Sequence, residues 1–154
     1  MALLVQKFGG TSVGSVERIQ AVAERIGRCR DAGDSVVAVV SAMGHTTDEL
    51  SGLAAAINTS PPRREMDMLL ASGEQVSIAL LAMALNQQGV AAVSMTGPQV
   101  GIVTESIHGR ARILEIRTDR IRNHLNDGRV VVVAGFQGTS SGPGGIAEIT
   151  TLGR

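Results

Sequence analysis

LLVQKFGGTSVGSVERIQAVAERIGRCRDAGDSVVAVV, residues 3–40, is the stretch of sequence that decides the fold. Leu3 to Val5 predicts a strand that runs into the loop Gly9-Gly10, and the apolar spacing from Ser15 to Arg30 predicts an amphipathic helix. Gly33 follows the end of that helix. Ser35 to Val40 is then a valine-rich run, typical of a strand that is covered on both faces. The stretch therefore predicts a strand–helix–strand unit.

The same alternation of strands and helices continues to the end of the chain. It predicts an α/β fold, a three-layer sandwich with a mainly parallel central sheet and helices on both faces. Thr46 and Glu49 have capping-box spacing, and Gly73 is a candidate for a kink or a break in the long helix that contains it. The further elements that the pattern predicts are helices over 46–57, 64–88 and 118–125, strands over 90–95, 130–134 and 146–151, a hairpin or two short strands over 102–116, and a flexible loop over 140–145.

Composition narrows the class of protein. The chain has 154 residues, enough for one domain, with 14 basic and 14 acidic side chains. Zero net charge gives no reason to expect nucleic acid or an anionic membrane surface as a partner. The most apolar helical run, Val76 to Leu85, falls short of the roughly 20 residues that a bilayer requires. The single cysteine, Cys29, fits a reducing, cytoplasmic setting.

The first candidate site is the segment from Lys7 to Ser12, between a strand and a helix. Gly9 and Gly10 allow backbone N–H groups to approach an anion, and a lysine at the end of the strand reaches the same anion. The segment lacks the Lys-Ser/Thr pair of a Walker A loop and the glycine spacing of a dinucleotide fingerprint. From these residues alone, a phosphate site and an ordinary turn with a solvated lysine both stay open.

Further candidates lie at the predicted strand ends and in the long helix. Small and hydroxyl residues follow the second strand at 41–44 and 46–49, where open α/β sheets bind ligands, although the hydroxyl of Thr46 is also explained by helix capping. Glu74 is a carboxylate in an increasingly apolar helix, a costly position without a partner. Phe136 lies in another strand-end loop, and Arg154 is suited to a carboxylate or a phosphate. The three histidines lack zinc spacing, and no metal ligands are predicted.

Together these segments resemble the aspartate kinases of the amino acid kinase family, over the whole chain and in the family's order. The motifs are KFGGTS at 7–12, VSAMG at 40–44, TTDEL at 46–50, MDMLLASGE at 66–74, AGFQG at 134–138 and TTLGR at 150–154. The resemblance implies ATP-dependent phosphorylation of L-aspartate to 4-phospho-L-aspartate with Mg²⁺, the entry step to lysine, threonine and methionine.

The resemblance also implies a role for each motif. Lys7 would stabilise the phosphoryl group in flight, and Gly9, Gly10 and Ser12 would line the phosphate site. The residues that would bind aspartate are Thr47, Glu74, Phe136 and Arg154, with Glu74 on the ammonium and Arg154 on a carboxylate. Phosphoryl transfer needs positioning and charge stabilisation more than covalent catalysis, so this set of groups suits the reaction.

The sequence departs from the family after Arg154, where the family continues into a glycine-serine-aspartate loop, a nucleotide-binding half and regulatory domains. Residues 1–154 are therefore expected to form the amino-acid-substrate half, either as a fragment of a longer enzyme or with the remainder on another chain. This half is expected to be active only with that remainder, and to self-associate or associate with it. Two alternatives stay open. One is another phosphotransferase of the amino acid kinase family, and the other is a non-catalytic chain that binds aspartate or oligomerises.

Overall fold

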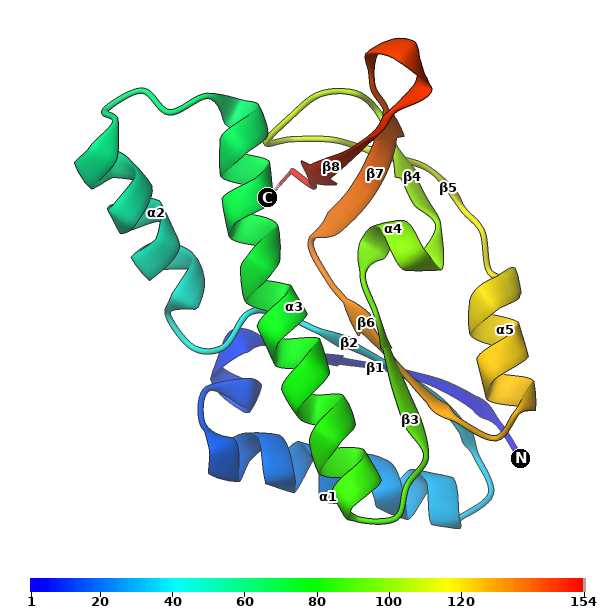
Figure 1. The fold of residues 1–154 in the computed structure, drawn as a ribbon. Helices are drawn as coiled ribbons and strands as arrows, with labels where there is room; N and C mark the ends of the chain where they lie inside the picture. Colours follow the sequence, from blue (N-terminus) through cyan, green and yellow to red (C-terminus); the bar gives the residue numbers. More distant parts are fainter. Residues whose placement is uncertain (154) are drawn as a thin grey trace.

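A parallel four-stranded sheet forms the centre of the fold (Figure 1). The computed structural model describes residues 1–153, apart from the side chain of Pro143. The strands follow the order β1-β2-β6-β3, and all three pairings are parallel. Their bounds are β1 Leu3–Phe8, β2 Ser35–Val40, β6 Val130–Ala134 and β3 Ala92–Met95. The predicted α/β fold with a parallel central sheet is confirmed.

The inner strands of the parallel sheet, β2 and β6, are covered by apolar side chains on both faces. Every residue of β6 is buried, which explains why its sequence is a run of valines rather than an alternating pattern. One face packs against helices α1 (Val16–Asp31) and α3 (Arg63–Gln87) through residues such as Ile26, Leu81 and Leu85. The other face packs against α5 (Asp119–Asn126). These helices give the three predicted layers.

A second, mixed sheet sits beyond the carboxyl ends of the parallel strands (Figure 1). Its order is β5-β4-β7-β8, with a parallel β4–β7 pairing between two antiparallel ones. Its strands are β5 Ile113–Ile116, β4 Ile102–Thr104, β7 Gln137–Ser141 and β8 Ala147–Thr151. The remaining elements are α2 Thr46–Ile57, α4 Gly97–Val100 and the 3₁₀ turns η1 Gly10–Val13 and η2 Pro143–Gly145.

Helix α3 connects the two sheets. It runs from beside β8 at its beginning to across α1 at its end (Figure 1). Gly73 neither breaks nor splits it, since the helix is continuous over 25 residues. By length and composition alone α3 would also be long and apolar enough to cross a membrane. The core helix of a soluble protein meets the same criterion, and the packing of α3 on α1, β3 and β8 is that of a core helix.

Local sequence signals fixed some helix ends and misled at others. Ser15 caps α1, its hydroxyl accepting a hydrogen bond from the Arg18 amide at 3.3 Å. A backbone N–H bond and the Ser15 hydroxyl lower the pKa of Glu17 in the first turn. The predicted capping box at Thr46 is wrong, because His45 occupies the N-cap and makes no side-chain capping bond. The loop predicted from Ser140 is also too long, since β7 extends to Ser141.

Candidate active site

The loops after β1 and β2 lie against each other at the carboxyl edge of the parallel sheet. Lys7 pairs in register with Val39 near the ends of these strands. The Gly44 amide donates a hydrogen bond to the Gly10 carbonyl oxygen at 2.9 Å. A Cβ atom on Gly10 would lie 2.8 Å from the Ala42 carbonyl oxygen, a distance that real Cβ atoms do not reach. Glycine at position 10 is therefore required for this close approach of two backbones.

Gly73 likewise allows a close approach, here between α3 and the loop after β2. A Cβ atom at this position would lie 2.9 Å from the Cβ of Ala42, so its absence lets the helix pack directly on the loop after β2. The next residue, Glu74, has only 3% of its surface exposed. The glycine that looked like a helix breaker thus brings a buried carboxylate to the sheet edge.

Phe136 reaches the same place from the end of β6. The Gly135 amide donates to the Val40 carbonyl oxygen at 2.9 Å, which joins this loop to β2. Phe136 has φ of 65°, and it is the one non-glycine residue in the described part of the chain with a positive φ. Such a conformation costs about 1–2 kcal/mol for an ordinary residue. The Leu152 amide, just after β8, donates to the Phe136 carbonyl oxygen at 2.9 Å and helps to hold this turn.

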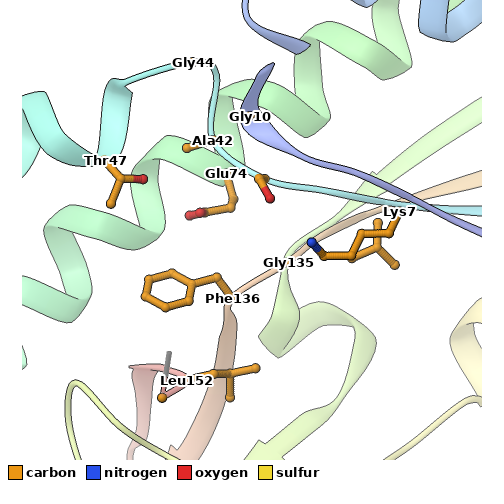
Figure 2. A pocket seen from close by; sticks show the side chains of 12 residues that line it. Lys7, Gly10, Ala42, Gly44, Thr47, Glu74, Gly135, Phe136 and Leu152 are labelled. Carbon is orange, nitrogen blue, oxygen red and sulfur yellow. The ribbon is translucent and has the colours of Figure 1, made fainter. Parts of the chain in front are cut away.

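These segments enclose a cavity of about 370 Å³, which we call the main cavity because Lys7, Glu74 and Phe136 all line it. Figure 2 shows the Lys7 amine, the Glu74 carboxylate and the Phe136 ring directed into the same space from β1, from α3 and from the turn after β6. Lys7 is the only lysine in the sequence. The lining residues are Lys7, Gly10, Val39, Ser41, Ala42, Gly44, Thr47, Glu74, Gly135, Phe136, Leu152 and Gly153.

The lining groups define what the cavity can do chemically. A primary amine, a carboxylate and an aromatic wall can together hold a small zwitterion and an anion beside it. The ammonium of Lys7 suits a phosphoryl group or a carboxylate, and the Glu74 carboxylate suits an ammonium. Close packing at Gly10 leaves a side-chain-free surface next to Lys7, which fits the phosphates of a nucleotide.

Candidate ligands for a magnesium ion are scarce among the residues that the structure describes. Within residues 1–153 no group of three or more histidine, cysteine, aspartate or glutamate side chains could hold a metal ion. Glu74 is the one carboxylate that lines the main cavity in this part of the chain. Among the described residues the cavity therefore offers one carboxylate as a candidate ligand for a magnesium ion, which ordinarily takes its other ligands from water and phosphate.

The structure brings together most of the residues that the sequence singled out. Lys7, Gly10, Thr47, Glu74 and Phe136 line one cavity, although they are spread over 130 residues of sequence. Gly9 and Ser12 do not line it, and Ser12 instead borders a neighbouring surface hollow with Arg18. Arg154 lies outside the described residues, so its predicted contact with a carboxylate stays a prediction.

A second hollow of about 520 Å³ adjoins the cavity and shares Phe136 and Gly153 with it. Its walls include Arg63, Arg110 and the buried carboxylate of Asp67. Sequence reasoning assigned Asp67 no role. The available signal was its spacing, because Asp67 precedes Glu74 by seven residues and so lies on the same face of a helix.

Comparison with known proteins shows the family of this chain. The family model described as "Amino acid kinase family" matches residues 2–152. The chain belongs to the amino acid kinase family.

Similar proteins within that family are aspartokinases. Over all 154 residues the chain is 61% identical to the aspartokinase of Bacillus sp. (strain MGA3) and 60% identical to that of Geobacillus stearothermophilus, covering 36% and 37% of those proteins. The structure of aspartate kinase from Synechocystis matches with 56% identity and a TM-score of 0.80. The match covers the whole of this chain and 24% of the Synechocystis chain. The chain thus spans little more than a third of the curated relatives it matches.

A more distant structure supports the fold alone. E. coli aspartokinase III, in complex with aspartate and ADP, matches with 23% identity and a TM-score of 0.81. The match covers the whole of this chain and 44% of the E. coli chain. The agreement extends over both sheets, since the entire chain is covered.

Proposed function

We propose that this chain forms the amino-acid-substrate part of an aspartate kinase, which transfers the γ-phosphoryl group of ATP to the side-chain carboxylate of L-aspartate. The product would be 4-phospho-L-aspartate, whose acyl phosphate is an activated starting point for lysine, threonine and methionine. The observation that carries the proposal is the convergence of Lys7, Glu74 and Phe136 on one cavity at the edge of the parallel sheet. The high identity to aspartokinases over all 154 residues supports the choice of substrate.

In the proposed reaction a carboxylate oxygen of aspartate attacks the γ-phosphorus of ATP. The bond from that phosphorus to the β–γ bridging oxygen breaks, and ADP leaves with the electron pair. No proton has to be removed from the attacking carboxylate, so the site needs no general base. Catalysis then depends on aligning the two anions and on offsetting their mutual repulsion.

Each cavity residue has a role in this proposal. Lys7 would offset negative charge on the phosphoryl group as it moves, with Gly9, Gly10 and Ser12 beside the phosphates. Glu74 would bind the aspartate ammonium, and Thr47 would add a hydroxyl contact. Phe136 would close the pocket, and Arg154 would bind a substrate carboxylate.

Residues outside this chain would complete the binding sites for the nucleotide and the metal ion. Magnesium supplies charge neutralisation on the ATP phosphates when it is bound. The proposal assigns this chain the amino-acid-substrate half and places the nucleotide-binding half and the regulatory domains in the remainder of the protein. Exposed apolar residues on the edge strand, Leu3 and Val5, agree with a covering partner, either that remainder or a second copy. We further propose a cytoplasmic location, with no nucleic-acid or membrane partner.

A coupled ADP-release assay on the complete natural protein tests the proposal. We expect turnover with ATP, magnesium and L-aspartate, and little with acetylglutamate, glutamate or a nucleoside monophosphate in its place. Preference for one of those acceptors would favour a different phosphotransferase of the same family. Aspartate binding without turnover would favour a chain that only binds its ligand.

A further inference from the structure

Asp67 is a fully buried carboxylate that sits at the centre of a hydrogen-bond cluster outside the main cavity. The residue is 0% exposed. The Thr151 hydroxyl donates to Oδ1 at 2.6 Å, and the Gly109 amide donates to both oxygens at 3.1 and 3.2 Å. His108 Nδ1 lies 2.6 Å from Oδ2. Because an ionised carboxylate only accepts hydrogen bonds, the tautomer with the hydrogen on Nδ1 fits this contact.

The donors come from two segments that are far from Asp67 in sequence. His108 and Gly109 form the turn between β4 and β5, and Thr151 ends β8. The two segments are also bonded to each other, since the Ala111 amide donates to the Thr151 carbonyl oxygen at 3.0 Å. One carboxylate on α3 therefore holds both segments of the second sheet against the helix.

The end of β8 leads straight into the wall of the main cavity. Thr151 is followed by Leu152 and Gly153, which both line that cavity. The Leu152 amide holds the strained Phe136 turn through its bond to the Phe136 carbonyl oxygen. Glu74, on the opposite wall, lies seven residues after Asp67 on the same helix, about 10.5 Å along its axis.

We propose that Asp67 is a positioning residue for amino-acid-substrate binding, a claim that rests on the proposed function. By fixing the end of β8 on α3, it sets the separation between Glu74 on the helix and the wall formed by Phe136 and Leu152. A substrate gripped at both ends requires that separation to be constant. A shift of about 1 Å in such a site costs up to a hundredfold in rate.

A residue that merely stabilises the fold would behave differently. Its loss would lower the melting temperature and the active fraction, and would leave the KM of the remaining active molecules unchanged. Asp67→Asn in the complete natural protein separates the two cases. It keeps the shape of the side chain, and its amide oxygen can still accept from Gly109 and Thr151 at the Oδ1 position. At the Oδ2 position, however, an NH₂ group that only donates now faces His108 Nδ1 and the Gly109 amide.

We expect Asp67→Asn to raise the KM for aspartate by about ten- to a hundredfold, with the KM for ATP within twofold of wild type. Leu85→Ala is the control, because Leu85 is fully buried at the far end of α3 and belongs to the core. It should lower the melting temperature and leave both KM values unchanged. Thr151→Val should reproduce the Asp67→Asn effect in weaker form, and Thr151→Ser, which keeps the hydroxyl, should restore wild-type aspartate KM.

Hydrogen–deuterium exchange provides a readout that does not depend on activity. Peptides covering 105–112 and 147–153 should exchange faster in Asp67→Asn than in wild type, and should be unaffected by Leu85→Ala. An active wild-type protein whose Asp67→Asn and Thr151→Val variants keep normal aspartate KM would overturn the inference, even if their melting temperatures fall. A wild-type protein without aspartate turnover would instead overturn the proposed function. The Thr151 pair carries the test if Asp67→Asn does not fold.

Discussion

Asp67 and Glu74 lie two turns apart on one face of α3, and both carboxylates are buried, with 0% and 3% of their surface exposed. Burial of a carboxylate is costly unless its oxygens have partners. Asp67 finds its partners in the turn after β4 and at the end of β8. Glu74, which is also buried, lines the main cavity. One helix thus anchors the second sheet at its beginning and places a cavity-lining carboxylate two turns later.

Lys7 is expected to act on charge that develops during phosphoryl transfer. In the complete natural protein, Lys7→Ala should lower kcat by about 10²- to 10³-fold, because a preorganised charge is lost from the reacting centre. The KM for aspartate should change little, since the proposed contacts of aspartate come from other residues. Steady-state kinetics with ADP release as the signal measure both values.

Arg122→Ala is the matched control, since it removes an exposed cation on α5 that does not line the cavity. It should leave kcat unchanged. Near-normal kcat in Lys7→Ala would rule out the proposed role. A large rise in aspartate KM at unchanged kcat would show that Lys7 binds the amino acid instead.

Glu74 is expected to bind the ammonium of the amino acid substrate. Glu74→Gln keeps the shape of the side chain and removes its charge, so a charge-assisted hydrogen bond worth about 1.5–3 kcal/mol is lost. This corresponds to a rise in aspartate KM of about 10- to 100-fold, with the ATP KM unchanged. Glu65→Gln on the same helix, where the side chain is exposed, should leave both constants alone. A selective rise in the ATP KM would reverse the assignment of the two substrates.

Much of the fold was readable from the sequence because its signals are local. Valine runs at 35–40 and 130–134 lie in strands covered on both faces, and helix α1 begins after Ser15 as its pattern predicts. The exceptions also have local causes. Thr46 fits a capping box by spacing alone, but the chain enters α2 through His45, whose backbone takes the N-cap place.

The candidate site was only partly readable, because its parts meet through tertiary packing. Lys7 and Glu74 stood out by residue type, whereas Leu152 and Gly135 carry no chemical signal and line the cavity only because β8 and β6 end there. Gly73 looked like a break in α3, since its sequence gives no sign that Ala42 packs against it. Asp67 was passed over for the same reason, as its donors lie 41 to 84 residues away.

A matched pair of glycine substitutions tests why Gly73 is there. Gly73 and Gly52 both lie inside helices, so replacing either by alanine should stabilise its helix by the same amount, about 1 kcal/mol, through helix propensity. Only at Gly73 does the new Cβ meet a neighbour, because nothing lies within 4 Å of the position at Gly52. Gly52→Ala should raise the free energy of unfolding, and Gly73→Ala should fall below it by about 1–3 kcal/mol of overpacking. Equal values from denaturant unfolding would mean that α3 has room at Ala42.

Two substitutions of Phe136 separate the effect of backbone strain on stability from the effect of the ring on substrate binding. Replacing it by alanine or by glycine removes the ring, so both variants should raise the aspartate KM to a similar extent. Only glycine adopts φ near 65° without strain. Phe136→Gly should therefore be more stable to denaturant than Phe136→Ala by about 1 kcal/mol. If the alanine variant were the more stable, the positive φ would not persist without the phenyl ring.

The isolated 154-residue chain is expected to show no useful kinase turnover, while the complete natural protein does. In the described residues 1–153 the cavity has an amine, an aromatic wall and a single carboxylate, and the chain covers little more than a third of its aspartokinase relatives. Since phosphoryl transfer depends on positioning both substrates, half of a site should lose most of the rate. The ADP-release assay on both proteins measures this directly, and comparable turnover from the short chain would contradict it.

An inactive short chain must still be distinguished from an unfolded one, and the single lysine makes this possible. Reductive ¹³C-methylation labels only Lys7 and the N-terminal amine, and it keeps the positive charge of the lysine. If the cavity forms in the short chain, adding L-aspartate should shift the Lys7 methyl resonance, because Glu74 and Lys7 line the same space. The shift should vanish in Glu74→Gln and persist in Glu65→Gln. No shift in a chain that is folded by circular dichroism would mean that aspartate binding itself requires the remainder of the protein.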